Sequence, residues 1–162
     1  MTKVQTALMG AGILLLSQAS QAASTSTTMA VTAAVTTSCI VVATPVVFGN
    51  YDPTLATDTA ASGAITVTCT TGTAYKVGLD AGVASGATVT TRKMANGASL
   101  LSYGLYQDAG HSNNWGNTPG TDTVNKTATV TPDVISVYGL LPKQQNVSAG
   151  AYTDTVNVTV NY

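Results

Sequence analysis

Residues 152–162 read YTDTVNVTVNY, and the alternation in this stretch decides the fold class. Its even-numbered positions are Tyr152, Asp154, Val156, Val158, Val160 and Tyr162, and every residue between them is Thr or Asn. A period of two residues predicts a β-strand that buries one face. Valine, threonine and tyrosine also favour strands. The chain therefore ends in a strand whose valine face packs on a core.

The same alternation recurs along the chain at a spacing of about ten residues, with turn residues rich in Gly between the runs. The predicted strands cover residues 27–36, 40–48, 64–70, 74–80, 89–94, 99–106, 124–131 and 135–141. Pro45 confines the second of these to a sheet edge or a kink. No helical period and no internal linker interrupts the pattern. It predicts one all-β domain, an immunoglobulin-like antiparallel β-sandwich.

Charged residues make up only 8% of the chain, and all seven acidic residues are Asp. No basic cluster is present, which argues against nucleic acid as a partner because phosphate binding needs concentrated Lys and Arg. The single histidine, His111, lies in an Asn- and Gly-rich stretch where a turn role is expected. The sequence thus predicts no enzyme activity, no catalytic residue, no metal site and no cofactor.

The N-terminus is typical of an export signal, predicted as residues 1–22. Lys3 is followed by an apolar run over residues 7–16 and by the small residues Ser20 and Ala22 before the cleavage point. The alternative is a membrane anchor, but the run is too short to span a bilayer. We therefore expect export without a membrane span.

Two cysteines, Cys39 and Cys69, remain in the mature chain. In an exported protein an isolated pair predicts a disulfide. The alternatives are two free thiols or metal ligands, although a metal site would need more Cys or His nearby. A disulfide would stabilise the fold by roughly 3–4 kcal/mol in the chain-entropy model.

Several short motifs occur together in a fixed order over residues 39–162. They are Cys39 followed by Phe48-Gly49-x-Tyr51, Gly63-x-Ile65-x-Val67-x-Cys69, Arg92-Lys93-Met94, Leu101-x-Tyr103-x-Leu105-Tyr106-x-Asp108, Trp115-Gly116, Val137-Tyr138-Gly139 and the closing stretch from Gly150. In this order they resemble the spore coat protein U domain. The resemblance implies a subunit of an archaic chaperone–usher pilus, whose sandwich lacks its last strand.

In that family a periplasmic chaperone first fills the gap left by the missing strand. At the outer-membrane usher, the N-terminal extension of the next subunit then replaces the chaperone by donor-strand exchange. The resemblance therefore implies, for this chain, other pilus subunits, a chaperone and an usher as partners. It implies a fimbria at the cell surface, with roles in adhesion and biofilm formation. A spore-coat role is the alternative that the family's name suggests.

Residues 23–38 precede the sandwich domain, predicted as residues 39–162, and residues 27–36 have strong alternation. The predicted donor face comprises Met29, Val31, Ala33 and Val35. The predicted acceptor-groove edges comprise Ile40, Val42, Val46 and Phe48 on the first strand, and Val156, Val158, Val160 and Tyr162 on the last.

The missing strand would run antiparallel to the last strand and parallel to the first. A parallel neighbour needs a connection of about a dozen residues, and only Thr37 and Ser38 separate the extension from Cys39. We therefore expect the extension to fill another copy. The alternative is that residues 27–36 form the first strand of a complete sandwich.

A second function class is a self-contained secreted coat or carbohydrate-binding module. Trp115 and the tyrosines could then form a sugar-binding platform, whereas core packing is the other role open to them. A tip adhesin usually has a second domain, so a shaft position is expected.

Overall fold

The computed structural model describes residues 21–162, so the predicted signal peptide lies almost wholly outside the described residues. The chain divides into two units, Met1–Ala34 and Val35–Tyr162, and each is described by itself. In the first unit, residues 21–34 contain no strand, and the side chains of Met29 and Val31 are exposed. Residues 21–162 contain no helix, and so none that could cross a membrane.

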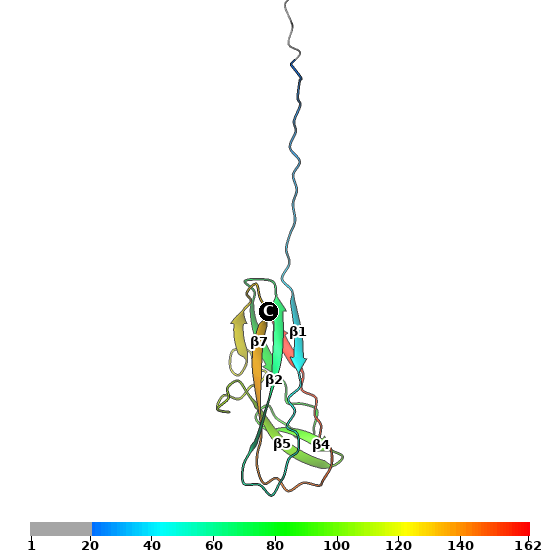
Figure 1. The fold of residues 1–162 in the computed structure, drawn as a ribbon, viewed down its shortest axis with the longest axis vertical. Coiled ribbons are helices and arrows are strands. Elements are labelled where there is room, and N and C mark those ends of the chain that lie inside the picture. The colour runs from blue at the N-terminus through cyan, green and yellow to red at the C-terminus, as the bar shows by residue number, and fades with distance from the viewer. Residues whose placement is uncertain (1–20) are drawn as a thin grey trace, which may run out of the picture. The chain divides into compact units, whose positions relative to one another are not determined.

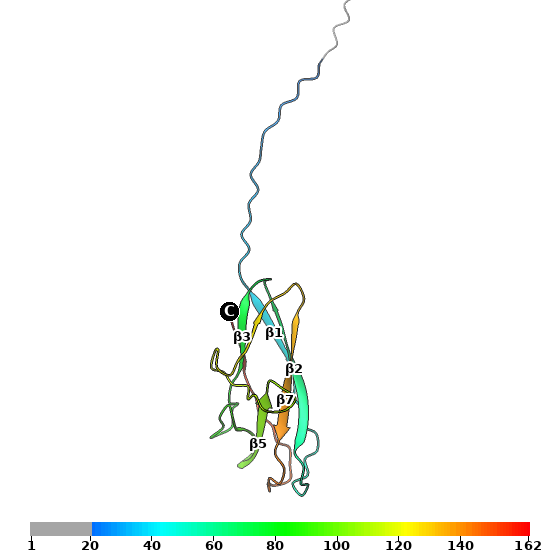
Figure 2. The same ribbon diagram turned by 90° about the vertical axis from the view of Figure 1, so that its left-hand side faces the viewer.

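The second unit is built from strands alone. They are β1 (Cys39–Thr44), β2 (Thr59–Cys69), β3 (Ala74–Leu79), β4 (Arg92–Asn96), β5 (Ser99–Tyr106), β6 (Val124–Thr127), β7 (Asp133–Leu141) and β8 (Val158–Asn161). One sheet has the order β1-β2-β7-β5-β4 and the other has the order β6-β3-β8. Every pairing is antiparallel. Figure 1 shows β2 and β7 side by side, and Figure 2 shows β3 on one side of the unit and β2 and β7 on the other. The predicted all-β sandwich is confirmed.

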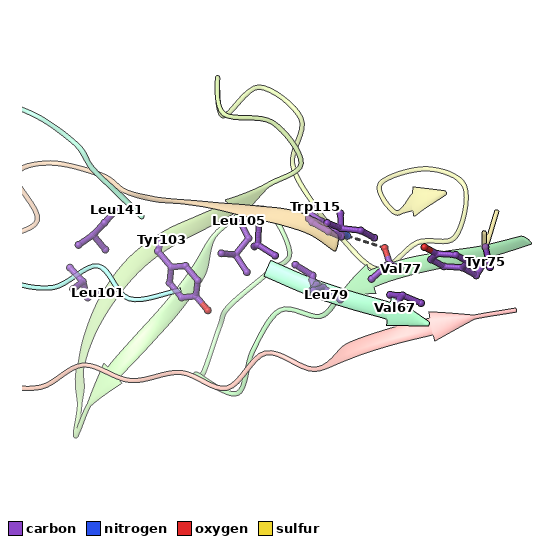
Figure 3. Packing of buried hydrophobic residues seen from close by; sticks show 13 residues of the cluster. Val67, Tyr75, Val77, Leu79, Leu101, Tyr103, Leu105, Trp115 and Leu141 are labelled. Atoms are coloured by element: carbon purple, nitrogen blue, oxygen red, sulfur yellow. Dashed lines mark hydrogen bonds between the residues drawn. The ribbon is translucent and has the colours of Figure 1, made fainter. Parts of the chain in front are cut away.

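Alternating side chains from both sheets form the core between them. The buried apolar residues are Ile65, Val67, Tyr75, Val77, Leu79, Leu101, Tyr103, Leu105, Trp115, Ala128, Ile135, Val137 and Leu141. The phases predicted for β2 and β3 are those that the structure buries. Trp115 is completely buried, and its indole Nε1 donates a hydrogen bond of 2.9 Å to the Val77 carbonyl (Figure 3). The surface platform that Trp115 could have formed is therefore absent.

Several strands are shorter than, or shifted from, the ranges that the sequence predicts. β6 ends at Thr127 instead of residue 131, and β4 begins at Arg92 instead of residue 89. The first strand ends at Thr44 instead of residue 48, because Pro45 has no N–H to donate to a ladder. The last strand is reduced to Val158–Asn161, although alternation begins at residue 152. Its pairing with β3 stops because the Asp80 carboxylate accepts the Asn157 backbone N–H at 2.9 Å.

The predicted disulfide between Cys39 and Cys69 is confirmed. The two residues are direct cross-strand partners in β1 and β2, with Cα atoms 4.0 Å apart. The bond closes a separation of 30 residues at the point where the chain enters the sandwich. It holds β1, an edge strand, on the sheet.

Arg92 connects the end of β3 with two loops. Its guanidinium donates hydrogen bonds of 2.7–2.9 Å to the carbonyls of Leu79, Asp80, Val89 and Trp115. The residue is fully buried, and this burial lowers its pKa. Because a buried carbonyl without a donor is costly, the four acceptors make this arginine central to the fold.

We predict that Arg92→Met lowers the free energy of unfolding by roughly 3 kcal/mol or more, because several buried carbonyls lose their donor. The neighbouring Lys93→Met, at a partly exposed position, is the control and should change it by about 0.5 kcal/mol at most. Urea unfolding followed by the fluorescence of Trp115 measures both. Equal midpoints for the two variants would contradict the prediction.

Candidate functional site

A groove of about 420 Å³ lies between the two sheets of the sandwich unit. It lies where β1, the edge of one sheet, approaches β8, the edge of the other. In Figure 1, β1 runs away from the end at which the C-terminus lies, so the two edge strands have opposite directions. A strand placed between them would be antiparallel to one and parallel to the other.

The lining of the groove is largely apolar. One wall consists of Ala43, Thr44, Pro45, Val46 and Phe48, the floor of Ile65, Leu79, Met94, Tyr103, Leu105 and Val137, and the other wall of Tyr152, Thr153, Asp154, Val156 and Val158. The floor belongs to the core that fills the space between the sheets. At the groove, these core residues are therefore not covered by a further strand of the described chain.

Gly139 in β7 makes room for one wall. A Cβ built at this glycine would lie 2.7 Å from Val46 Cγ1 and 2.8 Å from Phe48 Cζ. The missing side chain lets both residues pack down onto the sheet, where the Phe48 ring meets the edge of Tyr103 with centroids 6.0 Å apart. This packing keeps the chain after Pro45 in the groove wall although it forms no strand.

The four residues predicted for the first edge of the groove divide into two pairs. Val46 and Phe48 line the groove as expected, whereas Ile40 and Val42 lie outside the lining. The register explains this difference, because Ile40 and Val42 pair with residues on the outer face of β2, Thr68 and Thr66. Their odd-numbered neighbours pair with buried residues and hold the inner face. The inward phase changes from odd to even across Pro45, and a strict period of two misses this change.

On the opposite wall, Val156 and Val158 line the groove. Val160 is partly buried against the core beside its partner Val77, outside the groove lining. Tyr162, at the end of the chain, is 62% exposed and also lies outside it. Tyr152 lines the groove and was in phase with these residues in the sequence.

Both walls carry free backbone groups. Within the described residues, β1 pairs only with β2 and β8 pairs only with β3. Edge strands present rows of unpaired N–H and C=O groups to any extended chain beside them. An apolar floor between two such edges has the features needed to accept a strand, because ladders supply affinity and pockets supply specificity.

One charged side chain lies in the largely apolar lining. Asp154 accepts hydrogen bonds from the Tyr103 hydroxyl at 2.7 Å and from the Val83 N–H at 2.9 Å. Burial and the bond to Asp154 raise the pKa of Tyr103, so its hydroxyl stays a donor. The carboxylate is therefore engaged by this unit and fixes the start of the terminal segment.

His111 packs edge-on against Tyr106, with ring centroids 5.2 Å apart. In the part of the chain that the structure describes, no group of three or more His, Cys, Asp or Glu is placed to hold a metal ion.

The contribution of β4 and β5 to the groove, through Met94 and Leu105, had no signal in the sequence, which predicted residues 89–94 and 99–106 only as strands.

Comparison with known proteins gives a family. A family model described as the spore coat protein U domain matches residues 25–159. The chain belongs to this family. One relative is "Protein U" of Myxococcus xanthus, 38% identical over 126 residues, which are 71% of this chain and 70% of that protein.

Among solved structures, the fold is similar to a chain in the complex of the chaperone CsuC with the tip adhesion subunit CsuE. That complex comes from the archaic chaperone-usher Csu pili of Acinetobacter baumannii. The TM-score is 0.60 at 22% identity, and the match covers 79% of this chain. It spans 40% of the length of that other chain, so the similarity concerns the fold.

Acid should weaken the fold through Asp80. Burial acts to raise the pKa of this carboxyl, but hydrogen bonds from Asn157 and Gly82 outweigh burial, and the pKa lies below its ordinary value of 3.8. A folded-state pKa below the unfolded one adds stability above the unfolded value, and this stability is lost as pH falls through the folded value.

We predict that the free energy of unfolding falls below about pH 4, and that Asp80→Asn makes this fall smaller. Urea midpoints measured between about pH 2 and pH 7 test the difference. The prediction fails if the parent and the variant lose equal stability on acidification. Asp52 and Asp108, whose pKa values are also lowered by hydrogen bonds, leave some acid dependence in both proteins.

Proposed function

We propose that this chain is a structural subunit of a surface fibre, a pilus, that assembles by donor-strand exchange. The observation that carries the proposal is the groove between β1 and β8, with an apolar floor and a free backbone ladder on each side. Such a surface is costly in an isolated protein, since it exposes both core and strand edges. The family membership and the fold of the pilus complex support the same function.

The proposed donor is the extension over residues 23–38 of another copy. Its residues 27–36 alternate in sequence, and the side chains of Met29 and Val31 are 86% and 87% exposed. Burial in a groove would stabilise the assembly by roughly 1.5–3 kcal/mol for each large side chain. The face that we assign to the groove is Met29, Val31, Ala33 and Val35.

The short connection to β1 favours an intermolecular contact. A donor antiparallel to the terminal strand runs parallel to β1, because the two edges have opposite directions (Figure 1). A parallel connection needs about a dozen residues, whereas only Thr37 and Ser38 lie between the donor residues 27–36 and Cys39. Donation to another copy has no such restraint, and a head-to-tail contact that does not close produces a filament.

The remaining partners follow from this assembly. A subunit with an open groove needs a protein that covers it before polymerisation, and we assign this role to a periplasmic chaperone. Export through the periplasm, guided by residues 1–22, and assembly at an outer-membrane usher place the fibre at the cell surface. Adhesion and biofilm formation are the proposed roles, with this chain in the shaft.

A coat layer is the second candidate, because the family description names a spore coat. The same strand exchange could build either polymer, so the two functions differ in where the polymer lies. Immunogold labelling of intact cells separates them: filaments that extend from the surface indicate a pilus, and a continuous layer indicates a coat. The carbohydrate-binding alternative loses its predicted centre because Trp115 is buried.

Opposite faces of the donor segment provide a sharp test. We predict that Val31→Asp abolishes fibres, because it would place an unpaired carboxylate on the apolar floor of the groove. Thr32→Asp, one residue away on the other face of the segment, should leave fibres in nearly normal amounts. Electron microscopy and the SDS-resistant ladder of the sheared surface fraction measure assembly in the native host.

As a control, the amount of each variant in the periplasm must be measured and compared. Normal periplasmic levels of the Val31→Asp protein, together with a loss of ladders, locate the defect in assembly. Deletion of residues 23–36 should give the same result. Fibres of normal length from either altered chain would overturn donor-strand exchange.

A further inference from the structure

The outer face of the five-stranded sheet carries an apolar patch that the groove does not include. Ile40, Val42 and Val134 are 67%, 61% and 66% exposed, and we name them the outer patch. Val42 and Val134 lie in one cross-strand row, because each is the register partner of Thr66 in β2. Ile40 lies on the same face of β1, two positions before Val42.

The outer patch contains no charge. The positions between its members are the outward residues of β2, Thr66 and Thr68, whose methyl groups extend the apolar area. Large exposed β-branched side chains that flank β2 on both neighbouring strands, β1 and β7, are unusual on a monomer and indicate an interaction surface. A strand in the groove would leave the patch exposed, since the patch lies on the opposite face of β1.

The chain that leads to the patch is held in a fixed direction by Thr70. The Thr70 N–H donates to the Ser38 carbonyl at 2.9 Å, and the Ser38 N–H donates to Thr70 Oγ1 at 3.1 Å. The same hydroxyl donates to the Thr36 carbonyl at 3.2 Å. With the disulfide one residue further along, the segment from Thr36 to Cys39 has little freedom to swing.

We propose that the outer patch is a second contact between consecutive copies, covered by the copy that receives the donor segment. This inference rests on the proposed function. Val42 lies four positions after Ser38, at most about 14 Å of extended chain, so the patch begins beside the neighbouring groove. The bonds of Thr70 keep it there. An uncharged patch also suits a neighbour with only 8% charged residues.

Thiol labelling of intact fibres tests the contact, because the chain's only cysteines form a disulfide. Fibres are prepared from chains that carry Val42→Cys, Val134→Cys or, as the matched control, Asn125→Cys. Asn125 is exposed on β6, an edge strand of the other sheet. Each sample is treated with a maleimide dye while intact and again after unfolding in urea, which gives the total thiol.

We expect the first two variants to label at least about 10-fold more slowly than the control in intact fibres, because covered thiols react slowly. After unfolding, all three should label equally. Two variants on different strands keep the test valid if one of them assembles poorly. Mass spectrometry verifies that the Cys39–Cys69 bond is intact.

Labelling of both patch variants at the rate of the control would overturn the second contact and leave donor-strand exchange standing. Two other results would instead contradict the proposed function itself. If the unaltered chain forms no fibres, or fibres persist without residues 23–36, the proposed function fails and the outer patch loses its partner.

Discussion

In the described residues, each sheet ends on the same side of the sandwich in an edge strand with only one pairing partner, and this constraint governs the rest of the structure. β1 and β8 leave a gap that is lined by apolar side chains and bordered by free backbone groups. A closed sandwich would cover this floor with one more strand. The structure instead retains the gap and secures its borders from behind. The function that we propose follows from the need to fill it.

The stability of the walls comes from contacts that do not cross the gap. Arg92 satisfies carbonyls at the end of β3 and in the loop around Trp115, whose ring fills the core from the far side. The Cys39–Cys69 bond holds β1 at one end, and Phe48 packs on Tyr103 at the other. The groove therefore has a formed floor before any donor arrives.

Much of this fold could be predicted from alternation, since a buried face repeats every second residue in a strand. The phases of β2 and β3 and the sandwich class follow from it, whereas the disulfide follows from an isolated cysteine pair in a chain predicted to be exported. The inward phase of β1 could not be predicted, because Pro45 ends the ladder and shifts the alternation. Nor could the early end of β8, which depends on the Asp80 carboxylate taking the place of a ladder partner at Asn157. Such competition between a side chain and the backbone leaves no periodic signal.

Both faces of β1 are apolar, because its register with β2 turns the odd-numbered residues inward and leaves Ile40 and Val42 outside. Inward residues reach the groove through Ala43 and, past the proline, Val46, while Ile40 and Val42 remain outside. A regular strand with the predicted phase would have turned Ile40 and Val42 into the groove and placed Val41 and Ala43 on the outer face. Because one short strand presents apolar side chains on both faces, the groove and the outer patch are separated only by its thickness. Val42 also lies only four positions after Ser38, so a chain that donates its extension brings its own patch to the receiving copy, which makes a second contact inexpensive in entropy.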